Sequence, residues 1–452
     1  MERMRQLERT GLFDAMVPRY TSYPTAPHFR DDDGLGSLGT WAGELDADAD
    51  ISLYLHIPFC ERLCWFCACR TQGVRSPEPV ARYLDVLKQE AASVAAALPQ
   101  GPKVRRIHWG GGTPTILTPE QITDLAGTLR DAFPIADSFE FSVEIDPTLV
   151  NRQKIEALAA AGMRRASIGI QDFDPGIQKA IGRQQSYEQT REVVDMLRDA
   201  GITSLNTDIV YGLPHQTLEG IRRSTEQVLT LAPDRVALFG YAHVPWMAKR
   251  QRMIDSDALP DTRARLDLLE QTEAQFADAG FVALGIDHFA LPGDSLATAA
   301  AQGRMRRNFQ GYTDDSCAAL IGLGASSISR FPGGYLQNAP GTAAYAGRIL
   351  GGGFATSRGY RFTLEDRVRA DLIERFLCDL SFDYSALEAS YGTFAEIVRP
   401  DIDRALNRFP GWLNWINGSL CLAEGGKPLA RLVAAEFDSF LKQGGARHSR
   451  AI

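Results

Sequence analysis

Four of the seven cysteines lie within one short segment, YLHIPFCERLCWFCACR (54–70). They are Cys60, Cys64, Cys67 and Cys69, so their spacing is C-x3-C-x2-C-x-C. Thiolates this close together bind zinc, bind an iron–sulfur cluster or take part in redox chemistry. A structural zinc site usually draws on two separated cysteine pairs, and this chain has no second pair. We therefore favour an iron–sulfur cluster, in which three thiolates hold three irons and the fourth iron is open to chemistry.

The other three cysteines, Cys317, Cys378 and Cys421, are scattered. An odd, partly clustered set differs from the even framework of a secreted disulfide-rich protein and indicates a reducing compartment. The N-terminus lacks the apolar stretch of a signal peptide, and no run of about 18 apolar residues could span a bilayer. We therefore expect a cytoplasmic protein.

The formal net charge is −8 and the pI is near 5.5. Such a charge disfavours binding to nucleic acids and to anionic membrane surfaces, and we expect neither as a partner. An acidic small-molecule substrate would need arginines or lysines placed locally around it.

From residue 51 onward, short β-rich runs alternate with longer amphipathic runs. Helix starts are marked by the capping-box spacing of Thr118 with Gln121, and of Ser186 with Gln189. Glycines stand where helix C-caps belong, at 162, 201 and 280. The predicted strands are 51–59, 104–111, 140–147, 164–172, 204–212, 235–243 and, as a seventh candidate, 281–289; the predicted helices are 78–98, 118–133, 151–162, 186–201 and 217–229.

This alternation predicts an α/β fold with a parallel sheet covered by helices. Periodicity alone fits either an open doubly wound sheet or a full or partial (β/α) barrel. The residues with chemical potential favour the barrel, because they follow consecutive strands and barrel chemistry collects at the carboxyl ends of strands. These residues are Cys60, Gly110 to Gly112, Glu144, Gln171, Asp208 and His243.

Four regions are predicted along the chain. The N-terminal arm (1–45) contains PRYTSYPTAPHF, whose prolines and aromatics predict extended backbone. The barrel follows at 46–290. A Gly-rich connecting segment (291–359) is expected to be loop-like and to contribute to the active site. Helical periodicity then predicts a small, mainly helical C-terminal domain at 360–452.

At this point several motifs together resemble a known family. A C-x3-C-x2-C loop after an apolar strand, followed by a Gly-rich strand end, is similar to the radical S-adenosylmethionine (SAM) enzymes, whose open iron chelates SAM. The combination resembles the oxygen-independent coproporphyrinogen III oxidases (coproporphyrinogen dehydrogenases) of that superfamily. The motifs, in order, are PRYTSYPTA, YLHIPFC with a cysteine two residues after the third, HWGGGTPT, IGIQDF, DIVYGLP, YAHVP and RNFQGYT.

The resemblance implies a radical SAM partial barrel, a [4Fe-4S] cluster and SAM, with two SAM molecules in the site. Its cluster ligands match Cys60, Cys64 and Cys67. Cys69 matches an extra cysteine that holds no iron, and a buried small hydrophobe is the alternative role for it. The matching SAM contacts are Tyr54, Phe66, Gly111, Gly112, Thr113, Glu144 and Ile328 for the first molecule, and Gln171, Arg183, Asp208 and Ala242 for the second.

Each of these residue types also has a plain structural role. A glycine triplet makes a tight turn, and Tyr54 and Phe66 could be core residues. Arg183 could be a solvated cation at a helix end, and Asp208 a strand-end cap. An isolated carboxylate such as Glu144 is costly to bury among apolar neighbours, which argues that it faces a ligand.

The substrate implied by the resemblance is coproporphyrinogen III, which carries about four negative charges on its propionates near neutral pH. Two segments pair arginine with aromatic surface suited to a flat-sided tetrapyrrole, 18–23 and 304–312. Each could instead be a basic surface patch. We expect the arm to close over the substrate, the alternative being a strap on the outside of the barrel. The candidate substrate residues are Arg19, Tyr20, Tyr23, Arg307, Phe309 and Gln310.

The implied activity is oxidative decarboxylation of two propionates to vinyl groups by 5′-deoxyadenosyl radical chemistry, in heme biosynthesis. It needs an external electron donor and acceptor, and we expect a monomer. Three alternatives stay open at this point: a heme-binding chaperone with the radical SAM fold, a heme-modifying radical SAM enzyme, and a zinc-stabilised structural protein. The chaperone branch lacks the cysteine matching Cys69 and the PRYTSYPTA arm, and this chain has both.

Overall fold

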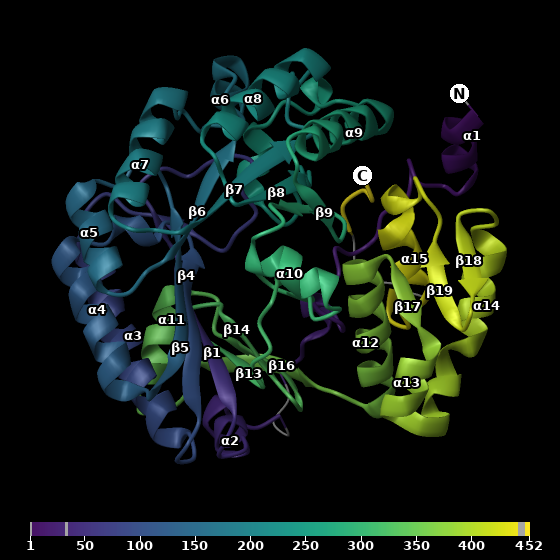
Figure 1. Cartoon of the computed structure of the whole chain (residues 1–452). Coiled ribbons are helices and arrows are strands. Elements are labelled where there is room, and N and C mark those ends of the chain that lie inside the picture. Colours follow the sequence, from purple (N-terminus) through teal and green to yellow (C-terminus); the bar gives the residue numbers. More distant parts are fainter. Residues whose placement is uncertain (1, 32–34, 442–447) are drawn as a thin grey trace.

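The computed structural model describes residues 2–31, 35–441 and 448–452. Its centre is a 12-stranded sheet in the order β16-β15-β14-β13-β1-β4-β5-β6-β7-β8-β10-β9. Six strands are parallel neighbours in chain order, as predicted for consecutive βα units (Figure 1). They are β1 (Asp50–Ile57), β4 (Lys103–Gly111), β5 (Ile135–Ile145), β6 (Arg165–Gln171), β7 (Ser204–Tyr211) and β8 (Arg235–Gly240).

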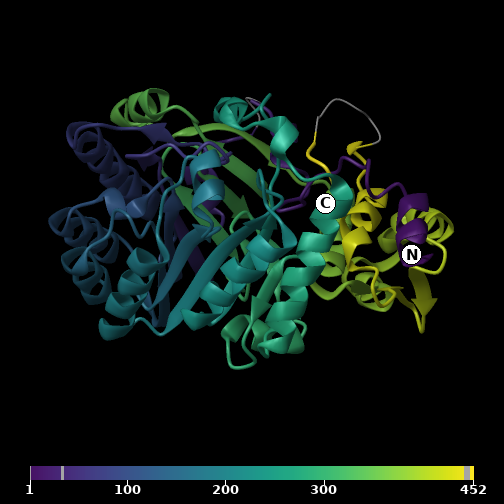
Figure 2. The same cartoon turned by 90° about the horizontal axis from the view of Figure 1, so that it is seen from above.

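Helices cover the outer face of the curved sheet, which Figure 2 shows from above. In the described residues β16 and β9 are the two edges and do not pair, so the barrel is partial, as predicted. The predicted capping box of Thr118 and Gln121 is present. The covering helices are α3 (Glu78–Ala97), α4 (Pro119–Ala132), α5 (Arg152–Ala160), α6 (Pro175–Ala180), α7 (Tyr187–Asp199), α8 (Leu218–Thr230) and α9 (Thr262–Asp278).

The strands alternate between an apolar and a polar face. On β1, Leu53 and Leu55 are at most 1% exposed and belong to the main hydrophobic core. The residues that alternate with them, Tyr54 and His56, face the opposite side because side chains alternate along a strand. A sheet with helices outside and polar groups inside has a lumen suited to a ligand rather than to a packed core.

The prediction for 281–289 as a seventh parallel strand is wrong. The segment forms a hairpin of β9 (Val282–Leu284) and β10 (His288–Ala290), and β10 pairs antiparallel with β8. The chain reverses at Gly285, which has a φ of +55°. No helix separates the two short strands, and a parallel connection would need a long crossover.

The expectation that 291–359 is loop-like is also wrong. Its glycines mark close approach of strands. A Cβ on Gly334 would stand 2.0 Å from the carbonyl oxygen of Tyr360, and one on Gly359 would stand 2.3 Å from that of Tyr335. The segment forms α10 (Ser295–Ala301), β11 (Arg306–Asn308), β12 (Gly311–Thr313), β13 (Ala319–Leu323), β14 (Ile328–Phe331), β15 (Gly334–Asn338), α11 (Thr342–Leu350) and β16 (Thr356–Arg361), and β13 extends the parallel sheet beside β1.

The C-terminal region is mainly helical, as predicted, and lies beside the barrel in both cartoons (Figures 1 and 2). It also contains a small antiparallel sheet that the periodicity did not reveal. Its elements are α12 (Leu364–Asp379), β17 (Ser381–Asp383), α13 (Tyr384–Tyr391), α14 (Arg399–Arg408), β18 (Leu413–Ile416), β19 (Ser419–Leu422) and α15 (Ala430–Glu436).

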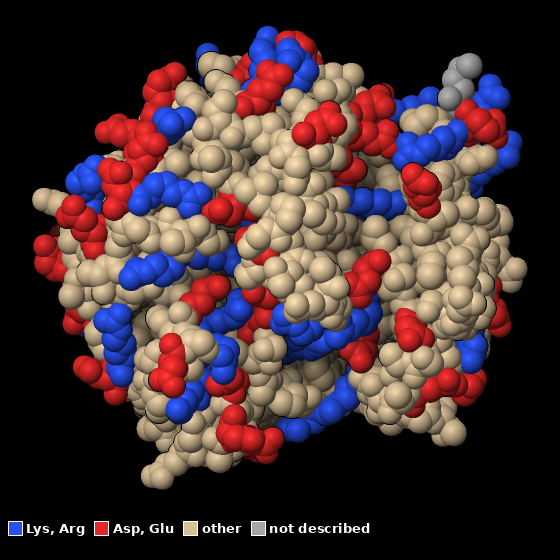
Figure 3. Space-filling model, in the orientation of Figure 1, with Lys and Arg blue, Asp and Glu red and all other residues tan. Residues whose placement is uncertain are grey.

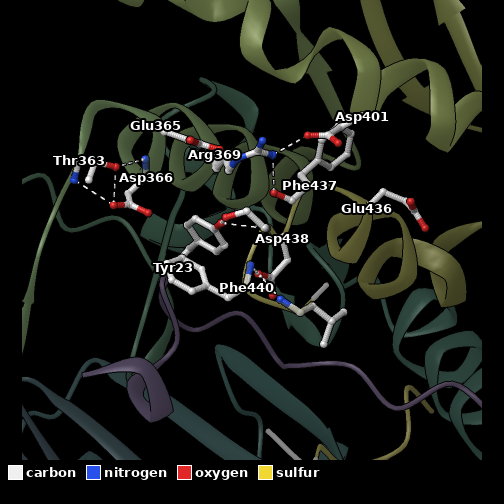
Figure 4. Close-up of polar contacts among 12 residues, drawn as sticks. Tyr23, Thr363, Glu365, Asp366, Arg369, Asp401, Glu436, Phe437, Asp438 and Phe440 are labelled. Atoms are coloured by element: carbon white, nitrogen blue, oxygen red, sulfur yellow. Dashed lines mark hydrogen bonds and ion pairs between the residues drawn. The ribbon is translucent and has the colours of Figure 1, made fainter. Parts of the chain in front are cut away.

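The N-terminal arm is tied to the C-terminal region. Tyr20 is 4% exposed and donates to Asp438 Oδ2 at 2.9 Å. Tyr23 is 3% exposed, and its ring meets that of Phe440 edge to face (Figure 4). Two helices of this region were not predicted. They are α1 (Glu2–Arg9), before Tyr20, and α2 (Leu38–Gly43), after Tyr23. Within the described residues, no helix is both long and apolar enough to cross a membrane.

Candidate active site

The cysteine loop is pinned at both ends. Cys60 belongs to β2 (Phe59–Cys60), which pairs in parallel with β3 (Gln72–Gly73) and so closes the loop on itself. In the middle, the backbone N–H of Trp65 donates to the carbonyl of Ile181 at 2.9 Å. Arg250 donates to the carbonyl of Cys69 at 3.0 Å. These contacts fix a short loop, without regular structure of its own, at the carboxyl end of β1.

Each predicted cluster ligand has a polar neighbour. Thr113 Oγ1 donates to Cys60 Sγ at 3.6 Å, and Arg183 Nη1 donates to Cys64 Sγ at 3.7 Å. A hydrogen bond from the Cys69 thiol is the largest effect on Cys67 and lowers the pKa of its thiol, which favours the thiolate that metals bind. Cys69 itself is exposed, so the alternative role of a buried small hydrophobe is wrong.

The donor set fits an iron–sulfur cluster. Over the described part of the chain, no group of three or more His, Cys, Asp or Glu side chains converges as the ligands of one metal ion would. Each iron of a cluster takes its own thiolate, so cluster ligands need not converge on a single point. Three thiols on one anchored loop, with Arg183 beside them to balance thiolate charge, suit such a cluster.

The glycine turn at the end of β4 leaves no room for side chains. A Cβ on Gly112 would stand 2.6 Å from the carbonyl oxygen of Phe59, and one on Gly111 would stand 2.5 Å from the His56 ring. Gly111 has a φ of +108°, a conformation that L side chains rarely adopt. The turn packs its backbone against the end of β1 and the start of the cysteine loop, where the N–H of Gly112 donates to the carbonyl of Ile57 at 2.8 Å and the N–H of Thr113 to that of Phe59 at 2.8 Å.

Glu144 faces this turn from the end of β5. Its Oε2 accepts from the N–H of Gly111 at 3.0 Å, and its Oε1 lies 3.5 Å from Nε2 of His108. Burial raises the pKa of the Glu144 carboxyl, but His108 and the Gly111 N–H outweigh burial, so the net pKa is lowered. Glu144 is thus held as an anion at the site, able to face the cation or hydroxyls of a ligand.

The site also contains two histidines, His56 and His108, that the sequence interpretation did not single out. The Tyr54 ring stacks on that of His108 with centroids 5.9 Å apart, and the Tyr54 hydroxyl lies 3.0 Å from His56 Nδ1. Burial lowers the pKa of His56, which favours the neutral ring. The available signal was the spacing of two residues from Tyr54 to His56 and from His108 to Gly110, which puts each pair on one strand face.

Gln171 and Arg183 meet at the end of β6. Gln171 is buried with a φ of +70°, and Arg183 donates to the carbonyl of Gly169 at 2.8 Å. Burial would lower the pKa of Arg183, but Asp146, 3.5 Å away, and Cys64 outweigh it and raise the pKa. Arg183 is therefore a buried, paired cation beside the cysteine loop, and its alternative role as a solvated helix-end cation is wrong.

Asp208 lies within β7 and faces a lumen cavity of about 200 Å³ that Glu144 also lines. Asn206 Nδ2 donates to Asp208 Oδ1 at 2.8 Å. Burial is the largest effect and raises the pKa of Asp208 to about 7, with Glu144 adding to the rise. Since Asp208 stands three residues before the end of β7, it is not a strand-end cap.

This pKa predicts a pH-dependent stability. In an unfolded chain the carboxyl ionises near pH ~3.9, so between pH ~4 and pH ~7 the folded protein keeps a proton that the unfolded chain has lost, and stability falls as pH rises. Asp208→Asn should make the melting temperature less sensitive to pH over this range, measured without added cofactors. Burial also raises the pKa of Glu90 to about 7. Glu90 therefore still contributes to the pH dependence of the melting temperature in Asp208→Asn, so this dependence should be reduced but not lost.

Asp195→Asn, at an exposed carboxylate on α7, is the matched control and should keep the slope of the unchanged protein. An identical slope in Asp208→Asn and the unchanged protein would contradict the assignment of a proton to Asp208.

The other predicted SAM contacts lie around the rim of the barrel, by which we mean the carboxyl ends of its parallel strands and the loops that follow them. Gln251 Nε2 links two of them, since it donates to the carbonyl of Phe66 at 2.8 Å and to that of Ala242 at 3.0 Å. The Phe66 side chain is also packed against an apolar cluster, as its core alternative predicted. Ile328 begins β14, and its backbone lies against Gly322, which pairs with Tyr54 across β13 and β1.

The predicted substrate residues divide into three pairs. Gln310 lines the lumen cavity, and the Phe309 ring packs edge to face on Tyr335. Arg19 and Arg307 lie together, since Arg307 donates to the Arg19 carbonyl at 3.3 Å. The hydroxyls of Tyr20 and Tyr23 are engaged by the C-terminal segment, and both residues line a cavity of about 340 Å³ beside it. Basic side chains gather around the hollow between the barrel and the C-terminal helices (Figure 3).

A parallel partial barrel with a three-cysteine loop after its first strand and a glycine turn after the next defines a radical SAM protein. The family model described as Radical SAM superfamily matches residues 54–228. Membership of this class implies a [4Fe-4S] cluster and SAM as cofactors.

Full-length relatives narrow the class to one family. The oxygen-independent coproporphyrinogen III oxidase of Paracoccus denitrificans is 52% identical over 452 residues and covers 100% of both chains. That of Helicobacter pylori strain J99 is 37% identical and covers 98% of both. The solved coproporphyrinogen III oxidase of Escherichia coli, described as a radical SAM enzyme, superposes with a TM-score of 0.89 at 34% identity, over 94% of this chain and 100% of that one. The chain belongs to the family of oxygen-independent coproporphyrinogen III oxidases.

Proposed function

We propose that this protein is the oxidoreductase that converts two propionates of coproporphyrinogen III to vinyl groups and so forms protoporphyrinogen IX. The observation that carries the proposal is identity of 52% along the whole chain to a relative of that activity, with the cysteine loop and glycine turn in place. The reaction belongs to heme biosynthesis without oxygen as oxidant.

In this proposal Cys60, Cys64 and Cys67 hold the cluster. The backbone of the glycine turn and the Glu144 carboxylate orient SAM. When bound, the reduced cluster and SAM supply a 5′-deoxyadenosyl radical that can remove a hydrogen atom. A second SAM would be held by the rim residues Gln171, Arg183, Asp208 and Ala242.

The same reaction takes place at each of the two propionates. One hydrogen atom leaves the β-carbon, the bond to the carboxylate carbon breaks with release of CO2, and one electron passes to an external acceptor. The protein's part is to hold the propionate near SAM and to exclude water, since a radical among side chains has fewer competing reactions. The lumen, lined by residues from β1, β4, β5, β6, β7 and β8, provides that enclosure.

The arm completes the proposal. Residues 18–23 run beside Arg307 and bind the C-terminal segment through Tyr20 and Tyr23, which supports a role in closing the substrate in. The external electron donor and acceptor, the monomeric state and the cytoplasmic location belong to the proposal as predictions.

The test is product analysis. Under anaerobic conditions the reconstituted protein, given a reductant, SAM and coproporphyrinogen III, should form a singly and then a doubly decarboxylated product, seen by mass spectrometry. Because one SAM serves one propionate, about two SAM should be consumed for each complete conversion. A product that keeps all its carboxylates would point to a heme-modifying enzyme, and tight heme binding without SAM cleavage would point to a heme chaperone.

A further inference from the structure

A second, smaller cavity lies outside the lumen, at the carboxyl ends of β7 and β8. Its volume is about 60 Å³. The arm, α9, the hairpin loop before β10 and the C-terminal residues 427–431 and 450–452 enclose it. Six cations line it, namely Arg19, Arg265, Arg307, Lys427, Arg431 and Arg450.

Carboxylates balance only part of this charge. Lys427 pairs with Glu273 at 2.8 Å, and Arg307 Nη1 lies 3.7 Å from Asp287 Oδ1. Among the described residues the other four arginines of the cavity form no ion pair. Three of them donate to backbone carbonyls instead, which satisfies N–H groups but leaves the positive charge uncompensated. Examples are Arg265 to the carbonyl of Tyr241 at 2.8 Å and Arg431 to that of Ala451 at 2.8 Å.

Some donors in this cavity have no acceptor. Arg307 is 7% exposed, and its Nε and Nη1 make no hydrogen bond within the described structure. The Nε of Arg265, 8% exposed, is in the same situation. Leaving such groups buried and unsatisfied costs about 1 to 3 kcal/mol each, and more for charged groups. Burial lowers the pKa of Arg431 to about 9, and it also lowers the pKa values of Arg19 and Arg265, although Asp287 partly opposes the effect on Arg19 and Arg431. Burial would also lower the pKa of Arg307, but Tyr312 and Asp287 outweigh burial and raise the pKa.

We infer that this cavity binds one propionate carboxylate of the substrate and anchors it while another propionate is at the cofactors. The inference rests on the proposed function. The sequence motifs singled out Arg19 and Arg307 for the substrate, and the structure adds Arg265, Lys427, Arg431 and Arg450 around them. The Nε groups of Arg307 and Arg265, which have no acceptor, can each donate a charge-assisted hydrogen bond to a carboxylate oxygen.

Size and position support a propionate. A cavity of about 60 Å³ has room for a carboxylate but not for a tetrapyrrole ring. Arg307 also lines a larger neighbouring cavity of about 340 Å³, together with Tyr20, Tyr23 and Tyr335. The aromatic side chains of the larger cavity suit the edge of the macrocycle, so a ring bound there could extend one propionate past Arg307 into the smaller cavity.

The test substitutes Arg307. Arg307→Gln should raise the KM for coproporphyrinogen III about 10-fold to 100-fold, a loss of the size expected for hydrogen bonds to a charged group. The kcat should change less than the KM. Arg307→Lys keeps a positive charge beside Asp287. The KM of this variant for coproporphyrinogen III should therefore lie between those of Arg307→Gln and the unchanged protein. Arg222→Gln, which removes an exposed arginine of α8, is the charge-matched control and should leave both constants unchanged.

A binding measurement separates anchoring from folding and from the proposed function. Coproporphyrin III, with four carboxylates, and protoporphyrin IX, with two, are titrated by fluorescence quenching without SAM. The unchanged protein should prefer coproporphyrin III, and Arg307→Gln should lose that preference while keeping protoporphyrin binding. Excess acetate should weaken coproporphyrin binding to the unchanged protein alone.

Equal preferences in the two proteins would overturn the carboxylate site even if the enzyme converts coproporphyrinogen III. Conversely, absence of conversion by the unchanged protein would overturn the proposed function, and the titration would still decide whether the cavity binds a carboxylate. Competition by acetate without any effect of porphyrin carboxylate number would show a site for free small anions and would also overturn the inference.

Discussion

Each of the single replacements Cys60→Ser, Cys64→Ser and Cys67→Ser will remove most of the cluster iron and all turnover. The reason is that only three thiolates on this loop are expected to hold the cluster, and a hydroxyl is a poor ligand for its soft irons. Loss of any one leaves an iron without a protein ligand. The measurements are iron and sulfide per chain after anaerobic reconstitution, the visible absorption of the cluster, and SAM cleavage under reduction.

Two controls make the result specific. Cys69→Ser should keep the cluster, because Cys69 is exposed and donates toward Cys67 in place of offering its own thiolate. Cys421→Ser, at a half-buried thiol on β19 of the C-terminal region, should keep both cluster and activity. If Cys69→Ser lost its iron while Cys67→Ser retained it, the ligand assignment would be wrong.

Gly112→Ala will weaken SAM binding. The added Cβ would meet the backbone at three places within 2.8 Å, the carbonyl oxygens of Phe59 and Ile57 and the nitrogen of Phe59. Backbone cannot rotate away as a flexible side chain can, so the turn must shift from the end of β1 and from the cysteine loop. We expect the KM for SAM to rise at least ~10-fold, the effect of losing about 1.4 kcal/mol of binding energy. The free energy of unfolding should fall by about 1 to 3 kcal/mol from overpacking.

Gly127→Ala is the matched control, because Gly127 lies inside α4 with no atom within 4 Å of the added Cβ. It should leave SAM binding unchanged and stabilise the protein by about 0.5 to 1 kcal/mol through helix propensity. SAM affinity in Gly112→Ala equal to that of Gly127→Ala would exclude the glycine turn from the cofactor site.

The amino-acid sequence by itself determined the features that depend on neighbouring residues. Cysteine spacing within one loop restricts the metal chemistry whatever the rest of the chain does. Alternation of β-rich and amphipathic runs specifies βα units, and a capping residue such as Thr118 satisfies the first backbone N–H groups of its own helix. For these reasons the six parallel strands, five of their covering helices and the positions of Gly111, Glu144 and Gln171 at strand ends were predictable, whereas α6 and α9 were not predicted.

The tertiary structure alone decided features in which distant segments meet. Glycines at 334 and 359 suggested loops, but they permit close contact between β15 and β16, which a local pattern does not reveal. The cation cavity brings Arg19, Arg265, Arg307 and Arg431 together although they are far apart in the sequence. The motifs pointed to Arg19 and Arg307 as substrate residues, but in the sequence Arg265 and Arg431 look like ordinary surface residues. Only the folded chain, which buries them around one small space with too few carboxylates, makes an anion there energetically favourable, because charge buried without compensation is costly.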